Sequence, residues 1–303
     1  MVHYLYLDQR DLIDLATSRD LVMEKRLGAL IQHGRAQVVL SFAHCIETWK
    51  YKDLGGRRAV AQYADSLRPW WCLTRQQLFL EEARLVIKAY LGQRVVHRWD
   101  LPISRGVTKS DCSERPFRPF RISVAETFHR TSSAIESSTS SFTDMLDILD
   151  EESHISTAVV MIHDTHPDVQ ARRTSMPSAN ASQMVTYIFG EEARKLGISA
   201  EQLTQFLSNF ENHQTPALDV YVRLREMIHK DTSTKPSPSE FVDIVHAVVL
   251  PYVDAFSTDK RIWDYIRRAR LSAAAYPPGC VRRMRAFRLL ADAIDWLEST
   301  APV

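Results

Sequence analysis

The sequence lacks a long hydrophobic run. Its first apolar segment, Val2–Leu7, ends at Asp8 after too few residues for a secretory signal peptide. No other stretch approaches the roughly 18 apolar residues that a bilayer-spanning helix needs. We therefore expect a cytoplasmic protein with no membrane partner.

Cysteine is also scarce, and several familiar enzyme motifs are missing. Cys45, Cys72, Cys112 and Cys280 are scattered and form no Cys-x-x-Cys pair, which argues against a structural zinc site and against a disulfide framework. The chain contains no Walker loop, Gly-x-Gly-x-x-Gly, Gly-x-Ser-x-Gly or His-Glu-x-x-His. Nucleotide hydrolases, dinucleotide-dependent dehydrogenases, serine hydrolases and zinc proteases therefore have no support from the sequence.

Neither sign of charge predominates, because 38 basic and 37 acidic residues leave a net charge of +1. The basic residues are unevenly distributed, however, and residues 265–291 hold seven arginines and no acid. Arg267, Arg268, Arg282 and Arg285 of this cluster could contact a nucleic-acid phosphate backbone.

The arginines after residue 281 also have a structural explanation. They could form the solvated face of an amphipathic last helix. The apolar side chains that would then point inward are Val281, Met284, Phe287, Leu290 and Ile294.

Asp8 is the most informative residue, because it separates a strand-like segment from a helix-like one. Residues 2–7 form a continuous apolar and aromatic run, as in a buried parallel strand, and residues 9–16 have helical spacing. Ligands of open α/β sheets bind beyond the carboxyl ends of such strands. The sequence therefore predicts a ligand or metal site beside Asp8.

Acids occupy comparable positions in two other parts of the chain. The segments concerned are a strand at 37–41, a buried helix at 240–250 and a strand at 252–260. Ser41 can cap a helix that carries Glu47, Asp243 lies in the later helix, and Asp259 ends the last strand. Any single one of the 37 acids is better explained as a helix cap or a solvated side chain, so the prediction rests on the combination.

Four carboxylates at one sheet edge suit a hard divalent cation, because magnesium prefers carboxylate oxygens and is held by few protein groups. Two such ions about 3.5–4 Å apart can activate a water and stabilise the leaving oxygen of an in-line displacement. Without a cation, the carboxylates would repel one another, and the pKa of at least one of them should rise.

These segments together resemble the PIN-like nuclease superfamily: Tyr-Leu-Tyr-Leu-Asp8, then Ser41 to Glu47, and Asp243 upstream of Asp-Ala-Phe-Ser-Thr-Asp259. The resemblance covers roughly the first 56 and the last 75 residues. It implies an α/β fold with a parallel sheet flanked by helices, and three or four carboxylates that hold Mg²⁺ or Mn²⁺ for phosphodiester hydrolysis. Gln9 stands where the usual pattern has Thr-Asn after the first aspartate.

The strand register decides between two acids near the C-terminal strand. If residues 253–257 run parallel to the first strand, Asp254 opens the strand and Asp259 follows its end, about 15 Å away. We therefore expect Asp259 to share the edge with Asp8, and Asp254 to be a structural or capping acid. Thr258 is expected to orient Asp259 or a metal-bound water.

Three further features have two interpretations each. His246 lies on the same helical face as Asp243, where a packed core histidine is favoured over a phosphate contact or a residue supporting a metal ligand. Trp70-Trp71 more often anchors a helical layer than stacks on bases. Residues 163–166, His-Asp-Thr-His, are more typical of a helix end than of a metal site.

The length allows one large or two medium domains. We expect a PIN-like core assembled from residues 1–56 and 235–303, with a mainly α-helical insertion at 57–234. This middle segment has no convincing alternating strand pattern. Helices are predicted within it at 78–90, 181–196, 200–210 and 216–229.

The leading functional prediction, implied by the resemblance, is a metal-dependent endoribonuclease. Asp8, Glu47, Asp243 and Asp259 would hold one or two Mg²⁺ or Mn²⁺ ions, and a metal-bound water would attack the phosphorus of an RNA substrate. A DNA nuclease is the enzymatic alternative. A catalytically inactive PIN-like scaffold that binds RNA or a protein is the alternative from another functional class.

Overall fold

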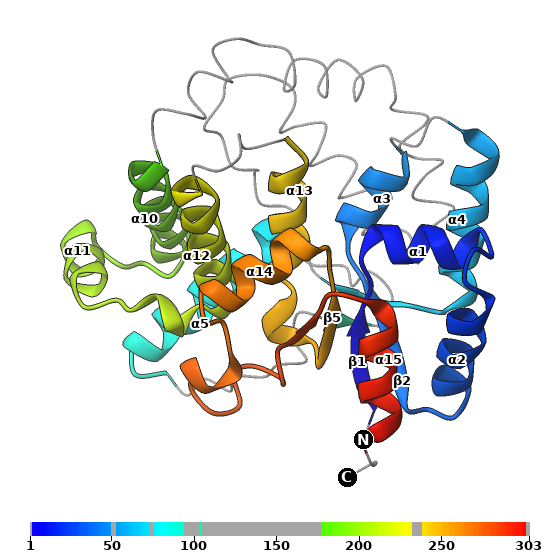
Figure 1. Cartoon of the computed structure of the whole chain (residues 1–303). Coiled ribbons are helices and arrows are strands. Elements are labelled where there is room, and N and C mark those ends of the chain that lie inside the picture. Colours follow the sequence, from blue (N-terminus) through cyan, green and yellow to red (C-terminus); the bar gives the residue numbers. More distant parts are fainter. Residues whose placement is uncertain are drawn as a thin grey trace.

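The computed structural model describes residues 2–49, 53–72, 75–93, 103–104, 177–231 and 238–300. Over these ranges the chain forms an α/β fold in which helices cover both faces of one sheet (Figure 1). Five strands are mutually parallel, and most of the middle segment that is described is helical. The predicted fold class, a parallel sheet flanked by helices with a mainly α-helical insertion, is confirmed.

The sheet reverses its strand order at β1. The strands are β1 (His3–Tyr6), β2 (Ala36–Leu40), β3 (Trp70–Cys72), β4 (Ile103–Ser104), β5 (Ala255–Ser257) and β6 (Arg285–Phe287). Their order is β4-β3-β2-β1-β5-β6, and only β4 runs antiparallel to its neighbour. The chain thus moves outward from β1 through β2 and β3 and returns on the other side of β1 as β5. Open α/β sheets bind ligands at such a reversal.

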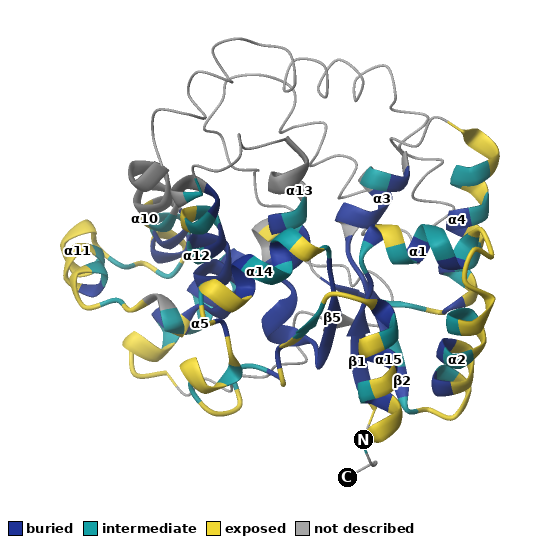
Figure 2. Ribbon diagram, in the orientation of Figure 1, coloured by how far each residue is buried: buried dark blue, intermediate teal, exposed yellow. Residues whose placement is uncertain are grey.

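Alternation along the strands builds two hydrophobic cores. Tyr4 and Tyr6 point to one face of the sheet, and Leu5 and Leu7 point to the other, as the twofold repeat of a strand requires. All four side chains are buried. Figure 2 shows this pattern as dark blue strands between helices whose outer sides are yellow.

The Leu5 face is covered by helices from both ends of the chain. They are α1 (Gln9–Ala16), α2 (Leu21–Gln32), α4 (Leu54–Ser66) and α15 (Leu290–Ser299). Each contributes an apolar stripe at helical spacing, such as Leu12 and Leu15 of α1. The helix α3 (Phe42–Trp49) begins directly after β2 and contacts α4.

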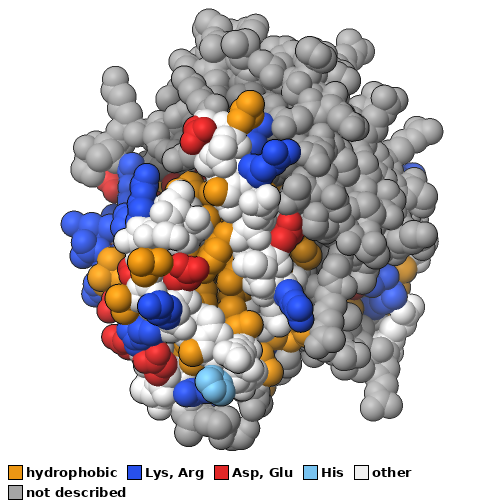
Figure 3. Space-filling model, turned by 90° about the vertical axis from the view of Figure 1, so that its right-hand side faces the viewer, with side chains coloured by type: hydrophobic (Ala, Val, Ile, Leu, Met, Phe, Trp, Pro, Cys, Tyr) orange, Lys and Arg blue, Asp and Glu red, His pale blue; other side chains and the backbone are white. Residues whose placement is uncertain are grey.

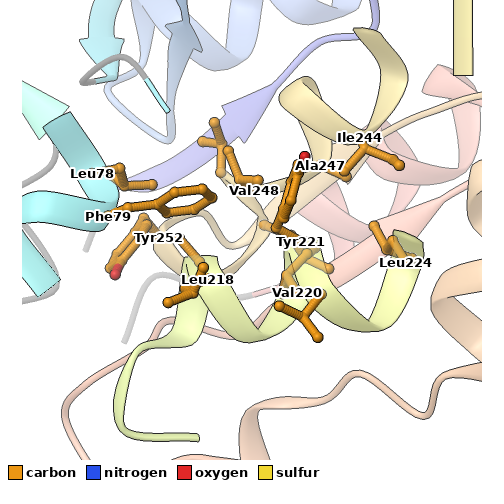
Figure 4. Close-up of a cluster of buried hydrophobic side chains, with 14 of the residues drawn as sticks. Leu78, Phe79, Leu218, Val220, Tyr221, Leu224, Ile244, Ala247, Val248 and Tyr252 are labelled. Atoms are coloured by element: carbon orange, nitrogen blue, oxygen red, sulfur yellow. The ribbon is translucent and has the colours of Figure 1, made fainter. Parts of the chain in front are cut away.

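The Tyr4 face is covered by the helices of the later chain. They are α5 (Arg75–Tyr90), α10 (Pro177–Lys195), α11 (Ala200–Ser208), α12 (Pro216–Lys230), α13 (Pro238–Ala247) and α14 (Lys260–Arg268). Figure 4 shows Phe79, Tyr221 and Ile244 of α5, α12 and α13 meeting in one cluster. The helices predicted at 78–90, 181–196, 200–210 and 216–229 are confirmed to within four residues at each end. Ser199 caps α11 in a complete capping box.

A buried acid joins two of these helices. The Glu82 carboxylate of α5 accepts the backbone N–H groups of Ala217 and Leu218 at 2.7 and 3.2 Å, and it also accepts the Tyr252 hydroxyl. It therefore satisfies two of the free N–H groups at the start of α12, where the N-cap Thr215 makes no side-chain capping bond. Short 3₁₀ helices lie at Asn212–Gln214, Leu250–Tyr252 and Ala273–Ala275.

Two expectations about secondary structure need correction. The expected domain boundary at residue 56 falls inside α4, and β3 and β4 continue the sheet within the segment taken for a helical insertion. The Trp70-Trp71 pair lies in strand β3, and its side chains pack in the cores beneath the helices, as the favoured interpretation expects. A three-residue strand shows no alternation in sequence, so its pairing with β2 becomes visible only in the fold.

The amphipathic helix considered for residues 281–294 is also not formed as expected. Residues 285–287 form β6, and α15 begins at Leu290. The backbone N–H groups of Arg282 and Met284 donate to Pro251 and Val253, and β6 then pairs in parallel with β5. These long-range hydrogen bonds override the helical spacing of the apolar residues. Across the described ranges, the helices include none that is both long and apolar enough to cross a bilayer.

Candidate functional site

Two aspartates lie at the carboxyl ends of adjacent parallel strands. Asp8 follows β1 and caps α1, and its Oδ1 accepts the N–H of Arg10 at 3.0 Å. Asp259 follows β5 and caps α14, and its Oδ1 accepts the N–H of Ile262 at 2.7 Å. Aspartate is favoured at both places because a helix N-terminus has free N–H groups and a partial positive charge. Local capping rules therefore bring two carboxylates to the same edge of the sheet.

The other two predicted acids come from the helices α3 and α13. Glu47 lies in α3, and its Oε2 is 2.8 Å from the Nε2 atom of His246 in α13. Asp243 precedes His246 by three residues and so lies on the same side of α13. His246 is buried, as a core histidine would be, and it also supports the candidate metal ligand Glu47. The interpretation as a buried core histidine is therefore confirmed, whereas a role beside a metal ligand stays a prediction.

The four carboxylates lie close enough to disturb one another. Burial raises the pKa of Asp243 to about 7, and the nearby charges of Asp259, Glu47 and Asp8 raise it further, against an opposing effect of His246. Burial also raises the pKa of Asp8, with added contributions from Asp259 and Glu47. The structure thus brings together all four acids proposed from the sequence, and their mutual repulsion contributes to the raised pKa values of Asp8 and Asp243.

Sequence reasoning missed two polar groups beside Asp8. The hydroxyl of Ser257 accepts the N–H of Asp8 at 2.8 Å. Burial raises the pKa of Asp11 to about 6, and Asp8 contributes to the increase, whereas the interaction of the Asp11 carboxyl with Ser257 lowers this pKa. The only signal in the sequence is the position of Asp11, which is three residues after Asp8. Thr258 is buried and its N–H donates to Phe287, and its expected role toward Asp259 stays a prediction.

Asp254 lies at the opposite end of β5 from Asp259. It accepts the backbone N–H of Tyr4 at 2.9 Å, pairs with Arg282 at 3.2 Å and lies 3.7 Å from the Nδ1 atom of His3. It is 2% exposed. This is the structural role that the strand register predicted for Asp254.

The expected nucleic-acid contact of Arg282 needs correction. Its side chain is buried, pairs with Asp254 and lies over the Tyr4 ring at 4.1 Å. Arg285 is exposed but begins β6 beside Ala255, at the same amino end of the sheet. The chain returns to the amino end of the sheet along α14 and the segment after it, which places both arginines away from the acids.

Arg267 and Arg268 occupy the exposed last turn of α14. Arg267 lies over the Trp263 ring at 4.6 Å, and Arg268 lies over the Tyr265 ring at 5.6 Å and 3.7 Å from Asp231. They are about 12 Å along the helix axis from Asp259. Their contact with a nucleic acid stays a prediction. On the face of the molecule shown in Figure 3, basic and acidic side chains are interspersed.

The four carboxylates are ligands of the kind that a divalent cation prefers, but the described side chains are not arranged as a complete metal site. Carboxylate oxygens are the preferred ligands of Mg²⁺ and Mn²⁺, and a cation would offset the repulsion that raises the pKa values of Asp8 and Asp243. Among the described residues, no three His, Cys, Asp or Glu side chains are arranged as a ready-made metal cage. The His-Asp-Thr-His segment at 163–166 lies outside the described residues.

Comparisons with family models, with curated proteins and with solved structures found no match to this chain.

Proposed function

We propose that the protein is a metal-dependent endoribonuclease with a PIN-like core. The observation that carries the proposal is the meeting of Asp8, Glu47, Asp243 and Asp259 at the sheet edge where the strand order reverses, with the pKa of Asp243 raised to about 7. A cluster of negative charge that lowers stability is expected where a bound cation compensates it. The likeness to the PIN-like superfamily supports the proposal through the same four positions.

The four acids would hold the cation from different helices and strand ends. Asp8 and Asp259 are held at helix N-termini by their capping bonds, so their carboxylates are fixed relative to β1 and β5. Asp243 and Glu47 face them from α13 and α3. When bound, Mg²⁺ or Mn²⁺ would activate a water and stabilise the charge that develops on the phosphodiester. No protein nucleophile is needed.

RNA hydrolysis with and without a cation tests the proposal. Purified protein should cleave members of a panel of single-stranded and structured RNAs with Mg²⁺ or Mn²⁺, lose activity with a chelator and regain it when the ion is restored. Asp8→Asn should lower the rate at least about a hundredfold, because several kcal/mol of charge stabilisation depend on the cation that it holds. The helix cap survives, since asparagine caps as well as aspartate.

Asp20→Asn is the matched control. Asp20 caps α2 through the N–H of Met23 at 3.1 Å and is exposed. The control loses the same charge at the same kind of position and should keep full activity. RNA binding without cleavage under any of these conditions would favour the scaffold, and cleavage of DNA alone would favour the DNA nuclease. Undiminished cleavage by Asp8→Asn would place the chemistry elsewhere in the chain.

A further inference from the structure

A chain of four polar side chains leads from the interior of the sheet to Glu47. The Ser41 hydroxyl lies 2.6 Å from the Tyr6 hydroxyl, and the Tyr6 hydroxyl lies 2.6 Å from the Nδ1 atom of His246. The Nε2 atom of His246 lies 2.8 Å from Glu47. The four residues come from β1, the end of β2, α3 and α13, so the chain links the elements that surround the acidic site.

Elementary donor and acceptor rules fix the direction of these hydrogen bonds. The Glu47 carboxylate can only accept, so the Nε2 atom of His246 must carry a hydrogen. In the neutral ring the Nδ1 atom is then an acceptor, and the Tyr6 hydroxyl donates to it. Burial raises the pKa of Tyr6 well above its ordinary value, which keeps its hydrogen in place. Ser41 in turn donates to Tyr6, because Tyr6 has no second hydrogen to give.

A second histidine, His44, packs beside Tyr6. The His44 ring lies 4.8 Å from the Tyr6 ring, and Phe256 stacks on the Tyr6 ring at 5.2 Å. The His44 Nδ1 atom accepts the N–H of Ser41 at 3.0 Å, and its Nε2 atom donates to the carbonyl of Leu7 at 2.9 Å. Burial lowers the pKa of His44 to about 3, so this ring is neutral.

Water has little access to this arrangement. Tyr6 and His44 have no exposed surface, and His246 is 7% exposed. A buried hydroxyl without solvent nearby has few alternative partners, so its hydrogen bond to His246 keeps one direction. The ring of His246 is consequently held in both orientation and tautomer.

We propose that His246 is a positioning residue: the Tyr6 hydroxyl orients its ring, and its Nε2–H fixes the Glu47 carboxylate for cation binding. The proposal rests on the proposed function, because it takes Glu47 to be a metal ligand. One Glu47 oxygen is engaged by the histidine, and the carboxylate plane is thereby set for the other oxygen to bind the ion. Loss of such a supporting hydrogen bond typically costs 10–100-fold in metal affinity.

Mn²⁺ affinity, measured by isothermal titration calorimetry, tests the positioning role. His246→Phe keeps a ring of similar size but cannot donate, and it should weaken Mn²⁺ binding by about 10–100-fold. His246→Gln retains a donor for Glu47 and should recover much of the affinity. Tyr6→Phe removes one oxygen atom only and should weaken binding by a smaller factor, so it carries the test if His246→Phe does not fold.

Tyr276→Phe is the matched control for Tyr6→Phe. The Tyr276 hydroxyl is also buried and donates to a carboxylate, that of Asp219, at 2.9 Å, but it lies outside the acidic site. This control should bind Mn²⁺ as the wild type does. Unchanged affinity in folded His246→Phe, or equal losses in Tyr6→Phe and Tyr276→Phe, would overturn the positioning role.

The tautomer is tested separately by the ¹⁵N NMR shifts of the His246 ring in the metal-free protein. The wild type should carry a hydrogen on Nε2, and Tyr6→Phe should keep it, because Glu47 still accepts from Nε2. A wild-type ring protonated on Nδ1 would overturn the proposal. A wild type that binds Mn²⁺ through this network but never cleaves RNA would refute the nuclease while supporting the positioning role. Normal cleavage and normal Mn²⁺ affinity in His246→Phe would refute the positioning role while supporting the nuclease.

Discussion

The two ends of β5 carry an aspartate each, in opposite electrostatic surroundings. Asp254, before the strand, accepts a backbone N–H from Tyr4 and pairs with the buried Arg282. Asp259, after the strand, caps α14 and raises the pKa of Asp243 across the site. The strand between them has only three residues. An acid paired with a cation holds strands together, whereas a cluster of acids whose charges repel one another lowers stability.

The largest expected effect comes from removing one charge at each end of β5. Asp254→Asn leaves Arg282 buried without its counter-ion and should lower the free energy of unfolding by about 3–5 kcal/mol. Asp259→Asn preserves the helix cap and relieves repulsion, so without divalent cations it should change stability by less than about 1 kcal/mol. Urea denaturation of both variants measures the difference. Equal losses would show that the two acids play the same structural role.

A bound cation should stabilise the acid-rich end selectively. At a Mn²⁺ concentration about 100 times its dissociation constant, the wild type should gain about 2.7 kcal/mol in unfolding free energy. Asp8→Asn should gain much less at that concentration, whereas the Asp20→Asn control should gain as much as the wild type. Thermal unfolding with Mn²⁺ and with a chelator provides the measurement. A similar gain in Asp8→Asn would mean that the ion binds elsewhere.

Glu82 is a third kind of buried acid to set beside Asp254 and Asp259. Its hydrogen-bond donors are neutral groups: two backbone N–H groups and the Tyr252 hydroxyl. Burial raises its pKa to about 7, above the ordinary value of 4.5. The folded state therefore binds its proton more tightly than the unfolded state, and the associated stability is present below pH 4.5 and lost as the pH rises through 7. Glu82→Gln should remove this loss, which is on the order of 2 kcal/mol.

The measurement for Glu82 is the unfolding free energy of wild type and variant at pH 5 and pH 8, with chelator present. The variant should be more stable relative to the wild type at pH 8 than at pH 5. Taking the difference between the two proteins removes the titration of the acidic site, which both share. A constant difference at the two pH values would contradict the raised pKa.

The smallest expected effect concerns the arginines. Replacing Arg267 and Arg268 together by glutamine should weaken RNA binding and reduce the slope of log affinity against log salt by about 1 for each lost phosphate contact. Arg285→Gln removes an exposed arginine at the amino end of the sheet and should leave the slope unchanged. An unchanged slope in the double variant would indicate that Arg267 and Arg268 do not contact phosphates and only form a solvated helix face.

Local patterns were sufficient to place Asp8 and Asp259 at one edge of the sheet. Asp8 and Asp259 each stand where a strand gives way to a helix, and parallel strands bring such positions to one edge. The helices on the Tyr4 face were similarly visible from their spacing and their caps. The nuclease role of the four acids stays a prediction.

Features that depend on distant pairing could not be found in this way. β3 and β6 are three-residue strands defined by their neighbours, and Arg282 is buried because its segment bonds back to Pro251. Tyr6 and His246 are 240 residues apart, and no local pattern predicts that their side chains meet. Ser257 was missed for the same reason, because its partner Asp8 is 249 residues away.

The position of β1 between β2 and β5 also has a consequence for the order of events during synthesis. At typical elongation rates of about 5–20 residues per second, the ribosome makes Asp259 roughly 10–50 s after Asp8. The first strand can pair with β2 early, but its other neighbour and two of the four acids do not yet exist. A nascent chain therefore cannot assemble the acidic site on its way out of the ribosome, where RNA is abundant. The site forms only once the late segment has joined the sheet.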